Sequence, residues 1–145
     1  MKLNSGSLLL YAPVRVRDEV GFGDWLASLG PVEWIVVASS YHTLNIQAAA
    51  ERYPDAKIIG APAAEDKLNY VNGLIRKKFD YRCTDNTELE TVNSILEKEG
   101  VKLHYVNGGV TCNAILEFDL IYGHCHTFTD TIGREVPRDF KKPTI

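Results

Sequence analysis

A nearly unbroken apolar run at residues 33–38 constrains the fold of this chain more than any other feature. The run reads Glu-Trp-Ile-Val-Val-Ala and is rich in β-branched residues. Such a run is typical of a strand covered on both faces, because a strand with one wet face alternates apolar and polar positions. We therefore expect residues 33–38 to form a central strand of a sheet.

Short strands and helices alternate around this run. Strands are predicted at residues 8–11, ended by Ala12-Pro13, and at residues 57–59. Three helices are also predicted. The first helix is indicated by Val20, Leu26 and Leu29 and is expected to stop at Gly30-Pro31. The second is indicated by Ile46, Ala49, Ala50 and Tyr53 before Pro54, and the third by Pro62 as its first residue. Alternating strands and helices imply parallel pairing and so an α/β fold.

The second half of the chain has a different pattern. Residues 76–83 show no clear period and are interpreted as a loop. Residues 87–90 have the form of a capping box, which predicts a helix that starts there and ends before Gly100. Two β-like segments, 101–106 and 114–118, are separated by Asn107-Gly108-Gly109, which predicts a tight turn. A third β-like segment is expected at residues 127–131.

Composition places the chain as one ordinary globular domain over residues 1–145. It has 16 Lys and Arg against 19 Asp and Glu, a net charge of −3, which gives no basic surface for nucleic acid or an anionic membrane. No apolar run is long enough to span a membrane, and no signal peptide is recognised. Because Cys83, Cys112 and Cys125 are widely spaced, we expect reduced thiols and a cytoplasmic protein.

The first candidate site follows the central strand. Open α/β sheets bind ligands at the carboxyl ends of their strands, and His42 lies in the turn at residues 39–45. An imidazole there could ligate a metal, act as an acid or base, or cap the next helix. The capping or packing role is the simpler interpretation.

The second candidate is the pair His124 and His126, which flanks Cys125. A nucleophilic Cys–His pair can be drawn only here, although a buried, unreactive thiol is the simpler interpretation. In a regular strand, residues two apart project to one face, so His124, His126 and Asp130 would lie together. Two imidazoles and a carboxylate are a normal ligand set for zinc or iron, and a plain histidine pair is the alternative.

Segments of the first half carry a family resemblance. They are Gly6-Ser7-Leu8-Leu9-Leu10-Tyr11-Ala12-Pro13-Val14, Leu29-Gly30-Pro31-Val32-Glu33-Trp34-Ile35-Val36, His42, and Arg52-Tyr53-Pro54-Asp55-Ala56-Lys57. Together they resemble the DUF4336 proteins, a branch of the metallo-β-lactamase-like fold. The resemblance extends over residues 6–70 and returns at residues 120–122 and 127–130.

This resemblance implies one domain, a trimmed αββα sandwich with mixed sheets, and a metal site at the strand ends. The family's first metal motif is T-H-x-H-x-D-H. Its second histidine is kept as His42, whereas Ser40, Leu44 and Asn45 stand at the other ligand positions. Asp130 matches the bridging carboxylate, but the later histidines of the pattern are missing. The resemblance therefore does not imply the standard dinuclear site.

Two functions are expected from these features. The favoured one is a degenerate domain without a cofactor that acts as a binding or structural module rather than an enzyme. The alternative is a metal-dependent hydrolase or oxidoreductase, with one zinc or iron ion held by His42, His126 and Asp130, and with His124 as a further ligand. Because a trimmed sheet leaves edges that need cover, we expect a homo-oligomer. A small-molecule ligand is the other expected partner.

Overall fold

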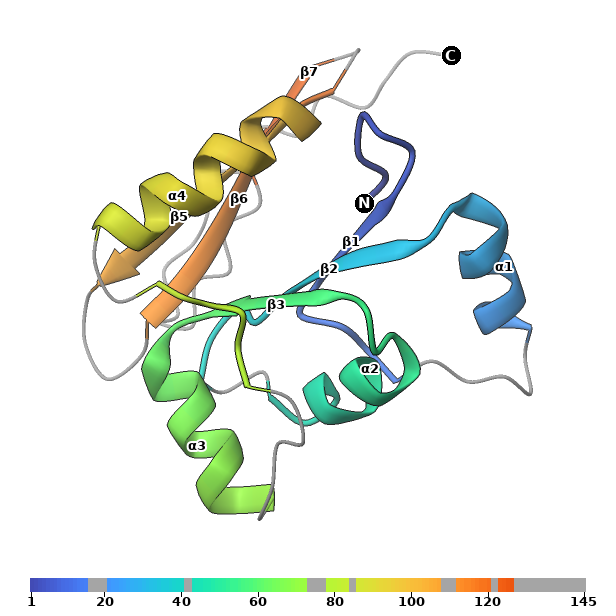
Figure 1. Ribbon diagram of the computed structural model, residues 1–145. Helices are drawn as coiled ribbons and strands as arrows, with labels where there is room; N and C mark the ends of the chain where they lie inside the picture. Colours follow the sequence, from blue (N-terminus) through green and yellow to red (C-terminus); the bar gives the residue numbers. More distant parts are fainter. Residues whose placement is uncertain are drawn as a thin grey trace, which may run out of the picture.

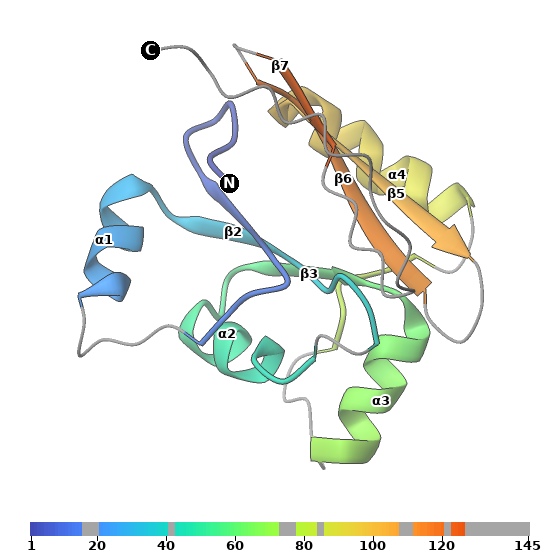
Figure 2. The same ribbon diagram turned by 180° about the vertical axis from the view of Figure 1, so that it is seen from behind.

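The structure, a computed structural model, describes residues 1–15, 21–40, 43–72, 78–83, 86–107, 112–120 and 123–126. Within these ranges the chain forms a mixed α/β fold with two sheets (Figures 1 and 2). A parallel sheet comes first along the chain, and an antiparallel sheet follows. None of the helices in these ranges combines the length and apolar character that crossing a bilayer requires.

The parallel sheet is formed by the strands of the first half. Its strands are β1 (Leu8–Tyr11), β2 (Val32–Val36), β3 (Lys57–Gly60) and β4 (Tyr81–Arg82), hydrogen-bonded in that order. The predicted central strand is β2, which pairs in parallel with β1 and β3. Alternate residues of β2 are buried in two different core clusters, Trp34 in one and Ile35 in the other. The prediction that this strand is covered on both faces is confirmed.

Three helices follow the first three strands, namely α1 (Phe22–Leu29), α2 (Ile46–Arg52) and α3 (Pro62–Asn72). The predicted stop of α1 at Gly30 and the predicted start of α3 at Pro62 are confirmed. Helices α2 and α3 cover one face of the sheet (Figure 1). The core on this face includes Ile35, Val37, Ile46, Ala49, Ala50, Ile58, Ala64, Leu68 and Phe79.

The second half of the chain covers the other face of the parallel sheet. Helix α4 (Asn86–Leu96) continues as the 3-10 helix η2 (Glu97–Glu99), and the antiparallel sheet contains β5 (Val101–Asn107), β6 (Cys112–Leu120) and β7 (Gly123–His126). One core cluster joins both sheets and α4. Its members include Leu9, Trp34, Val36, Ile59, Val92, Leu96, Leu103 and Leu116.

Several sequence predictions differ from the structure. The segment at residues 81–82 forms β4, although a strand this short has too few residues to show a period. Thr87 is the second residue of α4 rather than its cap, because the helix begins at Asn86. Among the described strands each sheet is of one kind and not mixed, since helical crossovers join the early strands and hairpin connections join the later ones. The strand expected at 127–131 lies outside the described residues.

The N-terminal segment covers part of the outer edge of β1. Lys2 forms an antiparallel bridge with Leu8, and Met1 and Leu9 exchange two hydrogen bonds of 2.8 and 2.9 Å. The loop between Lys2 and Leu8 is hydrogen-bonded to η2, because the Ser5 N–H donates to the Glu99 carboxylate at 2.8 Å. Beyond Leu9, the edge of β1 borders a pocket.

Candidate functional site

The carboxyl end of β2 is the position where the sequence predicts a site. Ser39 and Thr43 are buried there, but His42 lies outside the described residues. At the neighbouring end of β1, Ala12 has a φ of 45°, a left-handed conformation that costs a non-glycine residue free energy. The structure therefore describes the chain on either side of residues 41–42 but not His42 itself.

The other predicted ligands are placed only in part. His124 and His126 lie in β7, where His124 pairs with Asp119 and His126 with Glu117 of β6. Figures 1 and 2 show β7 near the N-terminus, whereas the chain leaves β1 and β2 toward α2 at the opposite end. Asp130 lies outside the described residues. A common site of His42, His124, His126 and Asp130 stays a prediction.

Cys83 is the one cysteine whose side-chain surroundings the structure describes, and they do not favour a nucleophilic thiol. Cys83 is buried in the core shared by the two sheets. Burial, with the nearby Glu88 carboxylate adding to it, raises the pKa of the Cys83 thiol to about 11. A thiol with such a pKa is almost wholly protonated at neutral pH and is a poor nucleophile. Cys125, the predicted partner of a histidine, lies in β7 opposite Phe118.

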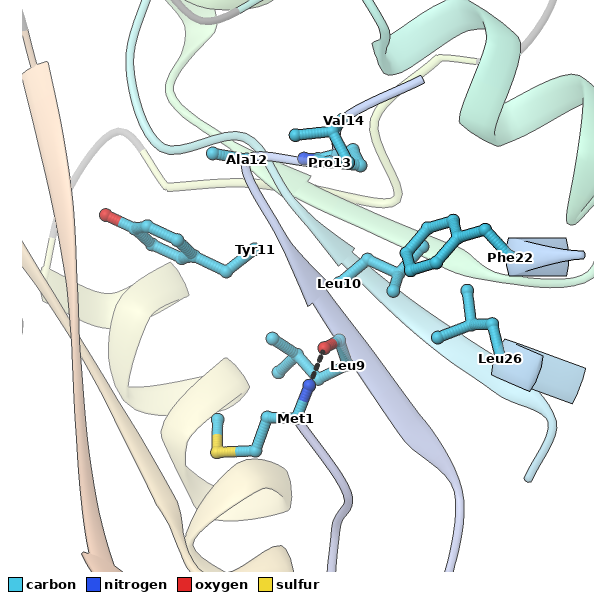
Figure 3. A pocket seen from close by; sticks show the side chains of 9 residues that line it. All are labelled: Met1, Leu9, Leu10, Tyr11, Ala12, Pro13, Val14, Phe22 and Leu26. Atoms are coloured by element: carbon cyan, nitrogen blue, oxygen red, sulfur yellow. Dashed lines mark hydrogen bonds between the residues drawn. The ribbon is translucent and has the colours of Figure 1, made fainter. Parts of the chain in front are cut away.

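A pocket of about 260 Å³ lies along the outer edge of β1. Its lining residues are Met1, Leu9, Leu10, Tyr11, Ala12, Pro13, Val14, Phe22 and Leu26. Figure 3 shows that both sides of β1 contribute: Met1, Leu9 and Tyr11 lie on one side, and Leu10, Phe22 and Leu26 on the other. The pocket therefore wraps around the edge of a strand rather than lying on one face of the sheet.

Local backbone features form the walls of this pocket. At one end, the Met1 amino group donates a hydrogen bond to the Leu9 carbonyl (Figure 3), and burial lowers the pKa of that amino group. At the other end, the left-handed Ala12 turns the chain out of β1 into Pro13. Helix α1 supplies the side wall. The outer edge of β1 is thus bordered by an apolar hollow between Met1 and Val14.

Apolar side chains protrude beside the pocket. Phe22, which lines it, stacks on Trp25 with ring centroids 5.5 Å apart. Trp25 is 55% exposed, and Val14, which also lines the pocket, is 65% exposed. Exposed large apolar side chains that line a pocket or stack on its lining are typical of a contact surface. No lining side chain carries a charge, so the surface is suited to an apolar group.

A second pocket, of about 620 Å³, lies at the amino ends of β2 and β3. It is lined by residues from the segments that carry the family resemblance, including Gly30, Pro31, Glu33, Arg52, Tyr53 and Asp55. The Arg52 guanidinium lies over the Tyr53 ring, 5.9 Å from its centroid. Open α/β sheets bind ligands at the opposite, carboxyl ends of their strands, where Ala12, Pro13 and Val14 line the pocket beside β1.

The pocket beside β1 could not be predicted from the sequence. Its residues are ordinary apolar ones, and the hollow exists only because Met1 folds back on Leu9 and α1 packs beside Leu10. One signal was present in the sequence. Phe22 and Trp25 are three residues apart in a helix, so both occupy one face, and an aromatic pair near a helix start is a candidate contact surface.

Comparison with known proteins adds no assignment, because no protein-family model, no curated protein and no solved structure matches this chain.

Proposed function

We propose that the chain is a domain of the metallo-β-lactamase-like kind that works as a binding module and not as an enzyme. The proposal of a sandwich is supported by the core cluster that joins the parallel and antiparallel sheets, with α2 and α3 outside the first sheet. The proposal of a binding module is carried by one observation, the apolar pocket beside β1 with exposed Val14 and Trp25 next to it.

The partner proposed for this surface is a second copy of the chain. In a two-fold interface the same patch meets itself, so it must both present a protruding group and offer a hollow. The surface beside β1 has both, since Val14 and Trp25 protrude next to the pocket. Its lining side chains are uncharged, and the Met1 amino group is hydrogen-bonded to the Leu9 carbonyl, so few like charges come together when two copies meet. An edge strand with apolar surroundings is also a common place for two chains to pair.

Light scattering coupled to size exclusion, over a range of protein concentrations, tests this proposal. We expect a dimer in the unmodified protein. Val14→Asp places a charge in the pocket lining and should weaken dimerisation at least tenfold, because a buried, unpaired carboxylate is costly. Trp25→Ala should weaken it as well, since it removes the largest exposed side chain of the surface.

Leu44 provides a matched control. It is 84% exposed and does not line the pocket, so Leu44→Asp makes the same kind of change elsewhere and should leave the dimer intact. A stable monomer at high concentration, or a dimer that survives Val14→Asp, would overturn the proposal. Tryptophan fluorescence adds a second readout. Dimerisation should shift the emission of Trp25 to shorter wavelength, a change that Trp25→Phe abolishes because Trp34 is already buried.

A further inference from the structure

A short segment that contains β4 is fastened to the outer edge of β3 by contacts that have no part in the proposed dimer. We call this segment, residues 79–83, the strap. Asp80 and Ile58 exchange two hydrogen bonds, from the Asp80 N–H to the Ile58 carbonyl at 2.9 Å and from the Ile58 N–H to the Asp80 carboxylate at 2.8 Å. The Cys83 N–H donates to the Gly60 carbonyl at 3.0 Å. In the strand order β1-β2-β3-β4 the strap lies at the opposite edge of the sheet from the pocket beside β1.

The strap inserts one aromatic ring into the core. Phe79 is 6% exposed, although Lys78 and Asp80 on either side of it are exposed. Its ring lies against Gly60, the last residue of β3, because a Cβ built on Gly60 would be 2.9 Å from Phe79 Cδ2 and nearer still to Cε2. Gly60 is not among the glycines with a positive φ, so glycine is needed here for space. The missing side chain at Gly60 thus forms a slot that fits a phenyl ring.

Few side chains of the strap are buried. Phe79 and Cys83 are buried, whereas the residues between them are exposed or half-buried. The strap is also held by Glu65 of α3, whose carboxylate accepts from the Phe79 N–H and pairs with the half-exposed Arg82. Segments with few buried apolar contacts open locally at lower free energy than the core strands do. The strap has this character, while β2 is buried on both faces.

We propose that the strap opens as one unit while the rest of the parallel sheet stays folded, and that this opening frees the slot at Gly60 for a ligand that carries an aromatic ring. In the closed state Phe79 occupies the slot, so the chain blocks its own site. The slot lies at the carboxyl end of β3, which is the end of the strands where open α/β sheets bind ligands. A ligand that binds only the open state shifts the population toward that state.

Native-state hydrogen exchange, followed by nuclear magnetic resonance, tests the opening in the unmodified chain. The reference is the Val37 N–H, which donates to the Ile59 carbonyl inside the sheet. Three N–H groups should exchange together with at least tenfold less protection than this reference, namely those of Asp80, Cys83 and Ile58. Ile58 is the decisive position, because it belongs to β3 but its N–H is bonded to the strap. Equal protection of the three groups and the reference would overturn the proposal.

Two variants separate opening of the strap from unfolding of the whole domain. Asn93→Ala removes hydrogen bonds to Leu103 in the antiparallel sheet. It should lower the protection of the Val37 N–H at least fivefold and leave the strap unchanged, because the strap opens without unfolding that sheet. Asp80→Ala removes the acceptor of the Ile58 N–H and should lower the protection of the strap at least tenfold. A strap that loses protection in step with Val37 in Asn93→Ala would contradict independent opening.

The slot is tested with benzene as the probe. Phe79→Ala leaves an apolar space of ring size at Gly60, and empty apolar cavities of this kind bind benzene. Saturating benzene should therefore raise the thermal midpoint of Phe79→Ala more than that of the unmodified protein, which is the control for binding in the pocket beside β1. An equal rise in both proteins would overturn the slot.

Gly60→Ala provides a second test if Phe79→Ala fails to fold. The added Cβ takes the place of the ring, so the strap should lose its protection against exchange while the Val37 N–H stays protected. A strap that stays as protected as in the unmodified protein would contradict the close contact of Phe79 with Gly60. Exchange and benzene binding report on the strap and light scattering reports on the dimer, so the two proposals are tested separately.

Discussion

The carboxamide of Asn93 forms two hydrogen bonds with the main chain of Leu103, both 2.8 Å long. Its Nδ2 donates to the Leu103 carbonyl, and its Oδ1 accepts from the Leu103 N–H. A neighbouring strand would offer one donor and one acceptor in the same way, so this side chain of α4 takes the place of a strand at the outer edge of β5. Edge strands whose main-chain N–H and C=O groups lack partners promote aggregation. Here a side chain of α4 pairs with such groups at the edge of β5.

Asn93→Ala should lower the free energy of unfolding by about 1–3 kcal/mol, because two main-chain groups of Leu103 lose their partner in a half-buried position. Asn93→Asp keeps the acceptor but places a charged carboxylate oxygen against the Leu103 carbonyl oxygen, so at neutral pH it should lower stability at least as much as Asn93→Ala. Urea unfolding followed by circular dichroism measures both. The exposed Ser94, which bonds only within its own helix through Thr91, is the control, and Ser94→Ala should change stability by less than about 0.5 kcal/mol. Equal losses in both alanine variants would contradict the edge-covering role.

Glu65 is a buried carboxylate that fastens α3 to β4. Its Oε1 accepts from the Phe79 N–H at 2.9 Å, and its Oε2 pairs with Arg82 at 2.6 Å. Glu65→Ala should cost about 3 kcal/mol of stability, since it leaves a buried N–H without its acceptor and removes the ion pair. Arg82→Met should cost less, about 1–2 kcal/mol, because the Arg82 side chain is 48% exposed, whereas the buried Glu65 carboxylate loses its ionic partner but keeps the Phe79 N–H. Denaturant unfolding of the two variants gives the comparison, and a larger effect of the arginine change would show that the ion pair outweighs the hydrogen bond.

Gly30 has room for no side chain, because a Cβ there would lie 2.2 Å from the Gly6 carbonyl oxygen. Its φ of 146° also disfavours other residues. Gly30→Ala should destabilise the fold by about 3 kcal/mol or more, by moving the Gly6 loop away from α1. Gly21 has a φ of 69° with nothing within 4 Å of its Cβ position, so Gly21→Ala should cost about 1–2 kcal/mol from the backbone alone. Thermal unfolding of both variants separates the steric contact from the backbone conformation.

The thiol of Cys83 should react slowly with Ellman's reagent at pH 8 in the folded protein and rapidly in urea. We expect this because its pKa is raised to about 11 by burial and Glu88, so little thiolate is present. A background with Cys112→Ser and Cys125→Ser isolates its signal. Between pH 9 and 11 the unfolded chain releases this proton before the folded one does, so stability should fall with rising pH more steeply than in a Cys83→Ala variant. Fast labelling of the folded protein would contradict the buried position.

Much of the parallel sheet could be predicted because its determinants are local. β2 is marked by its own run of β-branched residues, and α2 by its apolar period and by Pro54 after it. β4 could not be predicted, because two residues carry no period. Their strand conformation depends on pairing with Ile59 and Gly60, which are distant in the chain.

The candidate sites depend more strongly on tertiary structure. Sequence parity could group His124 with His126, but only the register of β6 and β7 shows that Asp119 and Glu117 lie opposite them. The pocket beside β1 depends on Met1 folding back and on a left-handed Ala12, a conformation that alanine rarely adopts. His42 and Asp130 lie outside the described residues, so the site built on them stays a prediction.

The tie between the N-terminal loop and η2 has a consequence for synthesis of the chain on the ribosome. Ser5 bonds to Glu99, and the Asn4 amide bonds to the Lys98 carbonyl, each across 94 residues. At about 5–20 residues per second, the loop waits roughly 5–20 s for its partners to be translated. During that interval β1 to β3 and their crossover helices can assemble, while the apolar face that later meets α4 and β5 stays open. A nascent chain stalled before residue 97 should therefore be a good client for a ribosome-associated chaperone.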